Sequence, residues 1–307
     1  GVVYRTGVGI SVEGGQAMTD DIFPDDFEVQ RQDGVAAGLD TFGLEHVSAS
    51  QISQYQRCPR QWAYRYVMGL RTPPDGGLIV GSGVHRAAEV AMLHKRDKGE
   101  AMPTEDVVDV AAGYITDSVE GGEVRLAEDQ QPGSLVDKAA RIARVWSDEA
   151  APLVEPLEVE QRFDIVLAGV PVTGRMDVVT ATGVVDWKTS GKAPNADDAA
   201  RSVQTELYAA ATGKPVEYVY LVDQVKGTRV VPVDIGAEAS AHAAGLAKDT
   251  VRDTAEGMAL GVWPRNRQGW HCSEKWCGFH DRCMAGRDDA LLRERAEQAR
   301  AAAGVMW

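Results

Sequence analysis

Apolar residues along the chain follow a helical period first and a strand period later. From residue 48 to residue 151 they recur at spacings of three and four. This pattern predicts a helix from Ser48 that Pro59 interrupts or restarts, a helix that opens at 81–83, and helices over 103–120 and 134–151. Residues 157–185 are instead rich in valine, with short turns near 169–171 and 181–183, which predicts an antiparallel meander.

Beyond the meander, the pattern alternates again between helix and strand. We expect helices over 201–212 and 238–257, a strand over 216–222 between them, and a charge-balanced helix over 291–303. Residues 1–47 have no sustained period and are rich in Gly, Asp and Glu. We therefore expect an acidic, flexible N-terminal tail there.

Composition and charge narrow the class of protein. The 307 residues are 44% hydrophobic, which is enough for a sizeable core, and no apolar run approaches the roughly 18 residues of a membrane span. No basic segment followed by an apolar stretch opens the sequence, so we expect a soluble cytoplasmic protein. The net charge of −14 opposes nucleic-acid binding, but residues 51–100 carry 8 basic against 4 acidic side chains.

The hairpin at 174–188 carries the clearest chemistry. A two-residue turn at 181–182 places Asp177 directly opposite Asp186, and Lys188 on the same face of the sheet. Two carboxylates so placed repel each other unless a cation lies between them, which indicates a divalent-metal site with an ammonium beside it. The alternative is an ordinary exposed hairpin with scattered charges.

Five short blocks in a fixed order point to a family. They are 48–66 with Cys58-Pro59, 81–89 with His85, 174–177, 186–188, and Gln204-x3-Tyr208. Together they resemble the PD-(D/E)xK nuclease superfamily, in its RecB-type branch with an iron-sulfur cluster, as in the AddB-subunit nuclease domain and CRISPR-associated adaptation nucleases. The resemblance covers about residues 48–283.

The resemblance implies a fold and an activity. The fold is an α/β restriction-endonuclease-like core, whose central mixed sheet is flanked by helices, with a helical insertion at about 95–152. An iron-sulfur segment would be formed by both ends of the core, and residues 284–307 would add a C-terminal helix. The activity is that of a metal-dependent DNA exonuclease acting on single strands or DNA ends in recombination, repair or DNA-end processing.

The resemblance also assigns roles by position. His85, Asp177, Asp186 and the main-chain carbonyl of Trp187 would bind Mg²⁺ or Mn²⁺, and Lys188 would be the catalytic lysine. Gln204 and Tyr208 would contact DNA or orient the lysine. Judged from the residues alone, His85 could equally be a helix-start or core histidine, and Gln204 with Tyr208 an ordinary pair on a helix surface.

The four cysteines form a second candidate site. Cys58 lies more than 200 residues before a tight trio, Cys272, Cys277 and Cys283. Two disulfides are disfavoured without a secretory signal, whereas a four-thiolate zinc site remains possible. The resemblance implies a [4Fe-4S] cluster, although the first gap in the trio is x4 where many relatives have x2, and His271 or His280 could replace a cysteine.

Basic and aromatic residues suggest how DNA would be held. Arg57, Arg60 and Arg65 in the first core segment are candidate phosphate contacts. Aromatic and basic residues alternate around the cysteine trio, which suits single-stranded nucleic acid or, alternatively, a small core around the cluster. The chain has no phosphate-binding loop for ATP, so any helicase, recombination or integration partner would be separate. The rival functions are a non-catalytic DNA-end-binding module and a CRISPR-type adaptation nuclease.

Overall fold

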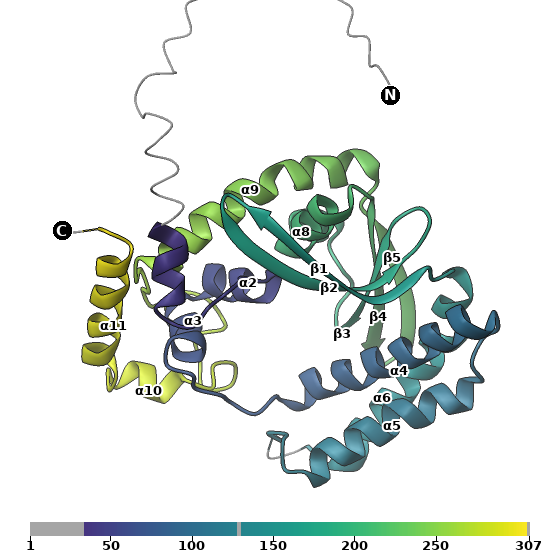
Figure 1. Ribbon diagram of the computed structural model, residues 1–307. Helices are drawn as coiled ribbons and strands as arrows, with labels where there is room; N and C mark the ends of the chain where they lie inside the picture. Colours follow the sequence, from purple (N-terminus) through teal and green to yellow (C-terminus); the bar gives the residue numbers. More distant parts are fainter. Residues whose placement is uncertain (1–33, 128–129, 306–307) are drawn as a thin grey trace, which may run out of the picture.

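A five-stranded mixed sheet forms the centre of the computed structural model, which describes residues 34–127 and 130–305 (Figure 1). The strands follow one another in sequence order across the sheet: β1 (Glu158–Leu167), β2 (Val170–Val179), β3 (Val184–Ser190), β4 (Val216–Gln224) and β5 (Gly227–Asp234). All neighbouring strands are antiparallel except β3 and β4, which are parallel. The connection between these two contains α7 (Ala196–Ala200) and α8 (Val203–Thr212).

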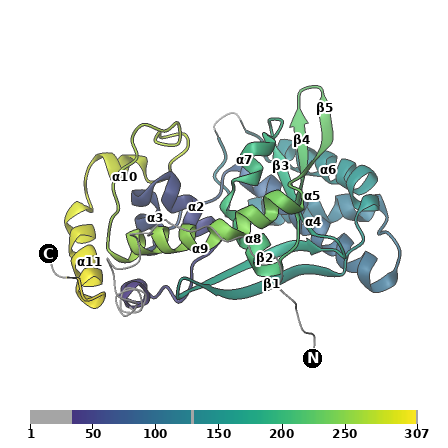
Figure 2. The ribbon, with the colours of Figure 1, turned by 90° about the horizontal axis from the view of Figure 1, so that it is seen from above.

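Helices cover both faces of the sheet (Figure 2). One face packs against α2 (Ala49–Arg57), α3 (Pro59–Tyr66), α8 and α9 (Ala237–Ala259). The other face packs against a lobe of α4 (Gly76–Lys98), α5 (Thr104–Glu120) and α6 (Pro132–Val145), which continues into a π-helical turn at Trp146–Ala150. The chain ends in α10 (His280–Met284) and α11 (Asp289–Ala302), beside α2 and α3. The expected α/β fold, a mixed sheet flanked by helices, is confirmed.

The central strand β3 is buried on both faces. Val184 belongs to the core on the α8 and α9 side, whereas Val185 and Trp187 belong to the core under the α4 to α6 lobe. A strand covered on both sides usually consists of apolar residues. Packing therefore does not explain the charged Asp186 within β3. Such an exception indicates a functional position.

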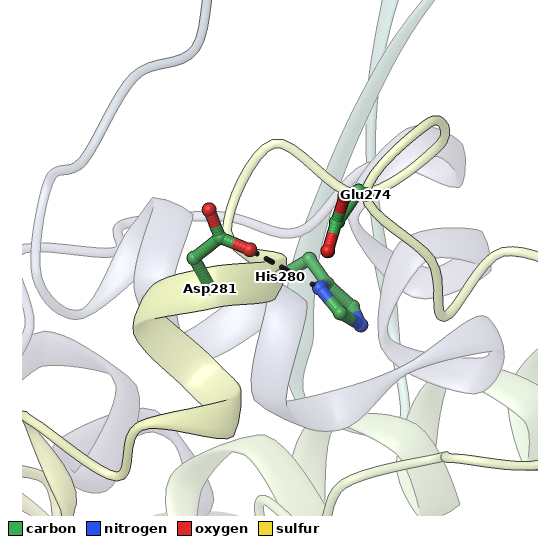
Figure 3. Close-up of side chains that lie close together, drawn as sticks. All are labelled: Glu274, His280 and Asp281. Carbon is green, nitrogen blue, oxygen red and sulfur yellow. Dashed lines mark hydrogen bonds and ion pairs between the residues drawn. The ribbon is translucent and has the colours of Figure 1, made fainter.

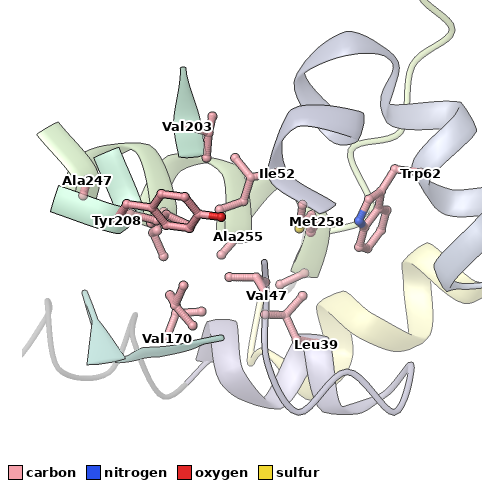
Figure 4. Close-up of a cluster of buried hydrophobic side chains, with 14 of the residues drawn as sticks. Leu39, Val47, Ile52, Trp62, Val170, Val203, Tyr208, Ala247, Ala255 and Met258 are labelled. Atoms are coloured by element: carbon pink, nitrogen blue, oxygen red, sulfur yellow. The ribbon is translucent and has the colours of Figure 1, made fainter. Parts of the chain in front are cut away.

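Residues 34–47 do not form the tail that the sequence predicted. Residues 34–40 are helical, Leu39 is 2% exposed and Val47 is fully buried, and both pack into the core with Met258 of α9 (Figure 4). Val47 also joins the sheet through hydrogen bonds with Pro171 and Thr173 of β2. The prediction was wrong here because tertiary packing orders a segment that has no sustained period of its own. The rest of the predicted tail, residues 1–33, lies outside the described residues.

The observed start of α4 also differs from the prediction. This helix begins at Gly76, capped by the side chain of Asp75, and not at 81–83. Within the described ranges, no helix is long and apolar enough to cross a membrane.

A like-charged pair across β4 and β5 leads to a stability prediction. Glu217 lies directly opposite Asp234, and burial, followed by the charge of Asp234, raises the pKa of Glu217. A raised carboxyl pKa means that ionised Glu217 opposes folding above its pKa. We therefore expect Glu217→Gln to increase the free energy of unfolding by about 0.2–1 kcal/mol near neutral pH, and to lose this effect below about pH 4.

Urea unfolding of both proteins at about pH 7.5 and about pH 4 checks this prediction. Glu100→Gln, at an exposed position after α4, is the matched control and should change little at either pH. A less stable Glu217→Gln protein at the higher pH would contradict the prediction.

Candidate active site

The β2–β3 hairpin has the predicted register but opens at the two aspartates. Val178 pairs with Val185 and Val179 with Val184, and this ladder ends one step before Asp177 and Asp186. At that step Asp177 Oδ2 accepts a hydrogen bond from the backbone N–H of Trp187 at 2.9 Å. A carboxylate thus takes the place of a ladder bond, and the two strands diverge around a pair of acidic side chains.

Asp186 is the most deeply buried charged group of the site, with 1% of its surface exposed. Burial, followed by the charge of Asp177, raises its pKa to about 6, against the opposing effect of Lys188. Its Oδ2 lies 2.5 Å from the Lys188 ammonium, yet no well-aligned donor hydrogen-bonds to this oxygen. A buried carboxylate oxygen with free lone pairs suits a metal ion.

His85 reaches the same place from α4. Its Nδ1 lies 3.3 Å from Asp177 Oδ2. Burial lowers the pKa of His85. The hydrogen bond and charge of Asp177 and the charge of Asp186 outweigh this effect, so the pKa of His85 is raised overall. One imidazole and two carboxylates are therefore gathered from α4, β2 and β3. This donor set fits Mg²⁺ or Mn²⁺, with the imidazole favouring manganese.

Glycines allow α4 to lie close enough to the sheet for this contact. A Cβ at Gly81, one turn before His85, would come within 2.9 Å of Thr189 Oγ1 on β3. Gly83 likewise faces Ile115 of α5, where a Cβ would come within 3.0 Å of its Cδ1 atom. The helix therefore keeps residues of poor helix propensity because packing requires them.

Gln204 and Tyr208 of α8 organise the acidic and basic groups. Gln204 accepts a hydrogen bond from Lys188 at 2.7 Å and donates to Asp186 Oδ1 at 2.7 Å. It also donates to the Tyr208 hydroxyl, which lies 2.6 Å from the Arg175 carbonyl oxygen and 3.1 Å from Asp186 Oδ1. Burial and the nearby carboxylates raise the pKa of Tyr208, so the phenol remains a neutral donor. Tyr208 is buried, which favours an orienting role over a DNA contact.

A cleft of about 750 Å³ opens above these groups, between α4 and the sheet. His85, Asp177 and Lys188 line it together with two ion pairs, Arg86 with Glu89 and Arg175 with Glu160. Neither ion pair is predicted by the sequence pattern, although Glu89 lies one turn after His85 on the same helix face. Glu160 has a positive φ of 52° within β1, which re-aims its side chain, and no sequence signal marks that conformation. Arg175 could have been noticed, since it lies inside the block at 174–177.

The four cysteines come together at a separate place. Cys58, Cys272, Cys277 and Cys283 line one cavity with Tyr64 and Phe279, and none forms a disulfide. Cys58 has the extended backbone that a following proline favours, at the junction of α2 and α3. Burial raises the pKa of the Cys277 thiol, and the neighbouring cysteines add to the shift.

A different group lies beside this cavity. Within residues 34–127 and 130–305, the one group of three His, Cys, Asp or Glu ligand atoms within 4.8 Å of one another is Glu274, His280 and Asp281 (Figure 3). Its carboxylates are exposed, and His280 Nδ1 lies 3.3 Å from Asp281 Oδ1. This is the geometry of an ordinary surface ion pair.

The predicted phosphate-binding arginines occupy three different environments. Arg57 is exposed and donates to Gln61. Arg60 pairs with Asp289 at 3.2 Å, so its charge is matched within the protein. Arg65 is half-buried, and its guanidinium lies 5.6 Å from the centre of the Tyr66 ring.

Comparisons with known proteins show the family to which the chain belongs and a likeness of fold. The model of the PD-(D/E)XK nuclease superfamily matches residues 46–284. The crystal structure of a "Putative exonuclease" from Eubacterium rectale has a TM-score of 0.51 and 12% identity, over 83% of this chain and 93% of that chain, which is a likeness of fold. The crystal structure of SSO0001 covers 77% of this chain and 93% of its own at 13% identity, with a TM-score of only 0.32. No curated protein matches the sequence. The family match spans most of the chain and includes every residue of the cleft, so the chain belongs to the PD-(D/E)XK nuclease superfamily.

Proposed function

We propose that this protein is a metal-dependent DNA exonuclease that hydrolyses phosphodiester bonds in single strands or at DNA ends. The observation that carries the proposal is that His85, Asp177 and Lys188 line one open cleft, with Asp186 buried 2.5 Å from the Lys188 ammonium. Recombination, repair and DNA-end processing, including CRISPR adaptation, all need this chemistry. The helicase, recombinase or integrase would be a separate partner.

His85, Asp177, Asp186 and the main-chain carbonyl of Trp187 would hold the cation, Mg²⁺ or Mn²⁺. When bound, the cation would supply a water of lowered pKa and offset the negative charge of the phosphate. Asp186 Oδ2 is buried with the Lys188 ammonium as its charged neighbour, and its remaining lone pair supports this assignment.

The remaining residues would position and stabilise charge. Lys188 is held between Asp186 and Gln204, so its ammonium is fixed beside the acidic pair. From there it can donate to a phosphate oxygen as negative charge develops in the transition state. Tyr208 and Gln204 restrict the rotamers of Asp186 and Lys188. These side chains are therefore already ordered before the reaction, which does not have to supply the entropy of ordering them.

We also propose that the four cysteines bind a [4Fe-4S] cluster. Four thiolates around one cavity suit either zinc or a cluster. The arrangement of one distant cysteine and a C-terminal trio supports the cluster, because the resemblance to the RecB-type branch implies this arrangement. The cluster would fasten the α2–α3 junction to the C-terminal segment, more than 200 residues away.

Digestion of end-labelled DNA tests the proposed function. Single-stranded and duplex DNA, each labelled at either end, should be degraded from an end with Mg²⁺ or Mn²⁺ and left intact in EDTA. Asp186→Asn removes one ligand charge and should abolish degradation. Metal-independent degradation, or full activity of Asp186→Asn, would overturn the proposal.

A further inference from the structure

Two tryptophans near the cysteines are exposed although their aromatic neighbours are buried. Trp270 is 71% exposed and Trp276 50% exposed, whereas Trp263 and Phe279 belong to the core. The two exposed rings meet edge to face with centroids 5.4 Å apart. The structure therefore divides the aromatic residues of this segment into a buried set and an exposed pair. Exposed apolar surface of this kind is typical of a binding site.

Tight turns hold the backbone under each ring. Cys272 donates to the Gly269 carbonyl at 2.9 Å, which closes a turn that contains Trp270. Trp276 and Cys277 both donate to the Ser273 carbonyl, which closes a second turn. Both rings are thus presented from ordered backbone, so a ligand that stacks on them would lose little affinity to ordering.

One cation lies against an exposed ring, and a second cation is exposed in the same segment. The Lys275 ammonium lies 5.1 Å from the centre of the Trp276 ring. Arg267 is exposed, and its guanidinium contacts the Met284 sulfur at 3.7 Å. Over the described residues, neither cation pairs with a carboxylate, whereas Arg265 and Arg282 pair with Asp289 and Asp288. Residues 265–287 carry five basic and two acidic side chains, in a chain of net charge −14.

The loop that carries the rings packs on the segment that leads to the cleft. A Cβ at Gly278 would come within 2.5 Å of Thr72 Cγ2. Five residues after Thr72, the first turn of α4 begins to line the cleft with Gly77 and Leu78. The loop that carries the rings therefore contacts the chain five residues before α4 begins to line the cleft.

We propose that Trp270, Trp276, Lys275 and Arg267 form a stacking platform for unpaired bases of single-stranded DNA. The platform rests on the proposed function and adds the form of the substrate to it. Unpaired bases offer free faces to aromatic rings and leave their phosphates for the neighbouring cations. Duplex DNA keeps its bases stacked on one another and cannot use the rings in this way.

The test compares two substitutions that retain apolar volume. Trp270→Leu/Trp276→Leu removes the aromatic faces, whereas Trp270→Phe/Trp276→Phe keeps a ring at each position. Binding of a fluorescent oligothymidine of about 20 nucleotides to the full chain is measured in EDTA, beside a blunt duplex. We expect the leucine variant to bind the single strand at least about fivefold more weakly, and the phenylalanine variant to keep most of the affinity. Leu153→Ala, at an exposed apolar position in the turn before β1, should match wild type.

The outcomes separate the platform from the proposed function. Equal affinity of the leucine and phenylalanine variants, or an equal loss on single strand and duplex, would overturn the platform. Hydrolysis of bis(p-nitrophenyl) phosphate by the wild type with Mn²⁺ reports the proposed chemistry without any base to stack. If the wild type cleaves this ester and the leucine variant binds single-stranded DNA with unchanged affinity, the platform is refuted and the proposed function stands.

Discussion

Lys188→Met is expected to reduce the turnover of DNA about 100- to 1,000-fold while the protein stays folded. Methionine nearly preserves the volume of the side chain but removes the ammonium that lies 2.5 Å from Asp186 and 2.7 Å from Gln204. The reaction then loses its fixed positive charge beside the phosphate. Asp186 also loses the larger of the two influences, Lys188 and His85, that lower its pKa, so this carboxyl holds its proton to higher pH and binds metal less well.

Single-turnover digestion of labelled DNA with saturating Mn²⁺ measures this loss. The matched control is Lys192→Met, two residues beyond β3, where the lysine is exposed. The control should cleave within about twofold of wild type, and Lys188→Met should bind DNA in EDTA with nearly unchanged affinity because most of the binding charge lies elsewhere. Cleavage by Lys188→Met at the wild-type rate would show that Lys188 has no role in catalysis.

The hairpin with its acidic pair could be predicted because its signals are local. The turn at 181–183 and the valine-rich strands determine which residues face one another, and the observed pairs Val178 with Val185 and Val179 with Val184 have that register. Asp186 is conspicuous in the sequence because it lies inside a strongly β-forming segment, where a charge is least expected. The prediction that His85 lies near Asp177 depended on the family resemblance, since no local sequence pattern connects α4 to β2.

Features that depend on tertiary packing could not be read from the sequence. The sequence predicts that α4 opens at 81–83, yet the helix begins at Gly76, where the side chain of Asp75 caps it, and Gly81 is needed for its close approach to Thr189. The edge strand β5, Gly227–Asp234, was missed because its short pattern includes Pro232 and few buried residues. The positive φ of Glu160 brings a further carboxylate to the cleft, besides Glu89 and Asp177, and nothing in the residue types around it indicates this.

Cys277→Ser is expected to remove the proposed cluster and to destabilise the protein by about 5 kcal/mol. Cys58 and the trio close a loop of more than 200 residues, and a cross-link over such a loop restricts the unfolded chain by about this amount. For a domain of this size, the melting temperature should fall by roughly 10 °C or more. Absorbance near about 400 nm should disappear from anaerobically purified Cys277→Ser protein, since serine is a poor ligand for iron.

His280→Ala is the matched control, because His280 lines the same cavity and is the nearest alternative ligand in the sequence. It should keep both the absorbance and the melting temperature if the four cysteines are the ligands. Loss of the absorbance in His280→Ala, with its retention in Cys277→Ser, would make the histidine a ligand in place of that cysteine. A colourless wild type with one zinc per chain would show that the four cysteines bind zinc, in a tetrahedral site, and not a cluster. In that case the structural role of the site survives, because either metal joins the α2–α3 junction to the segment that precedes α11.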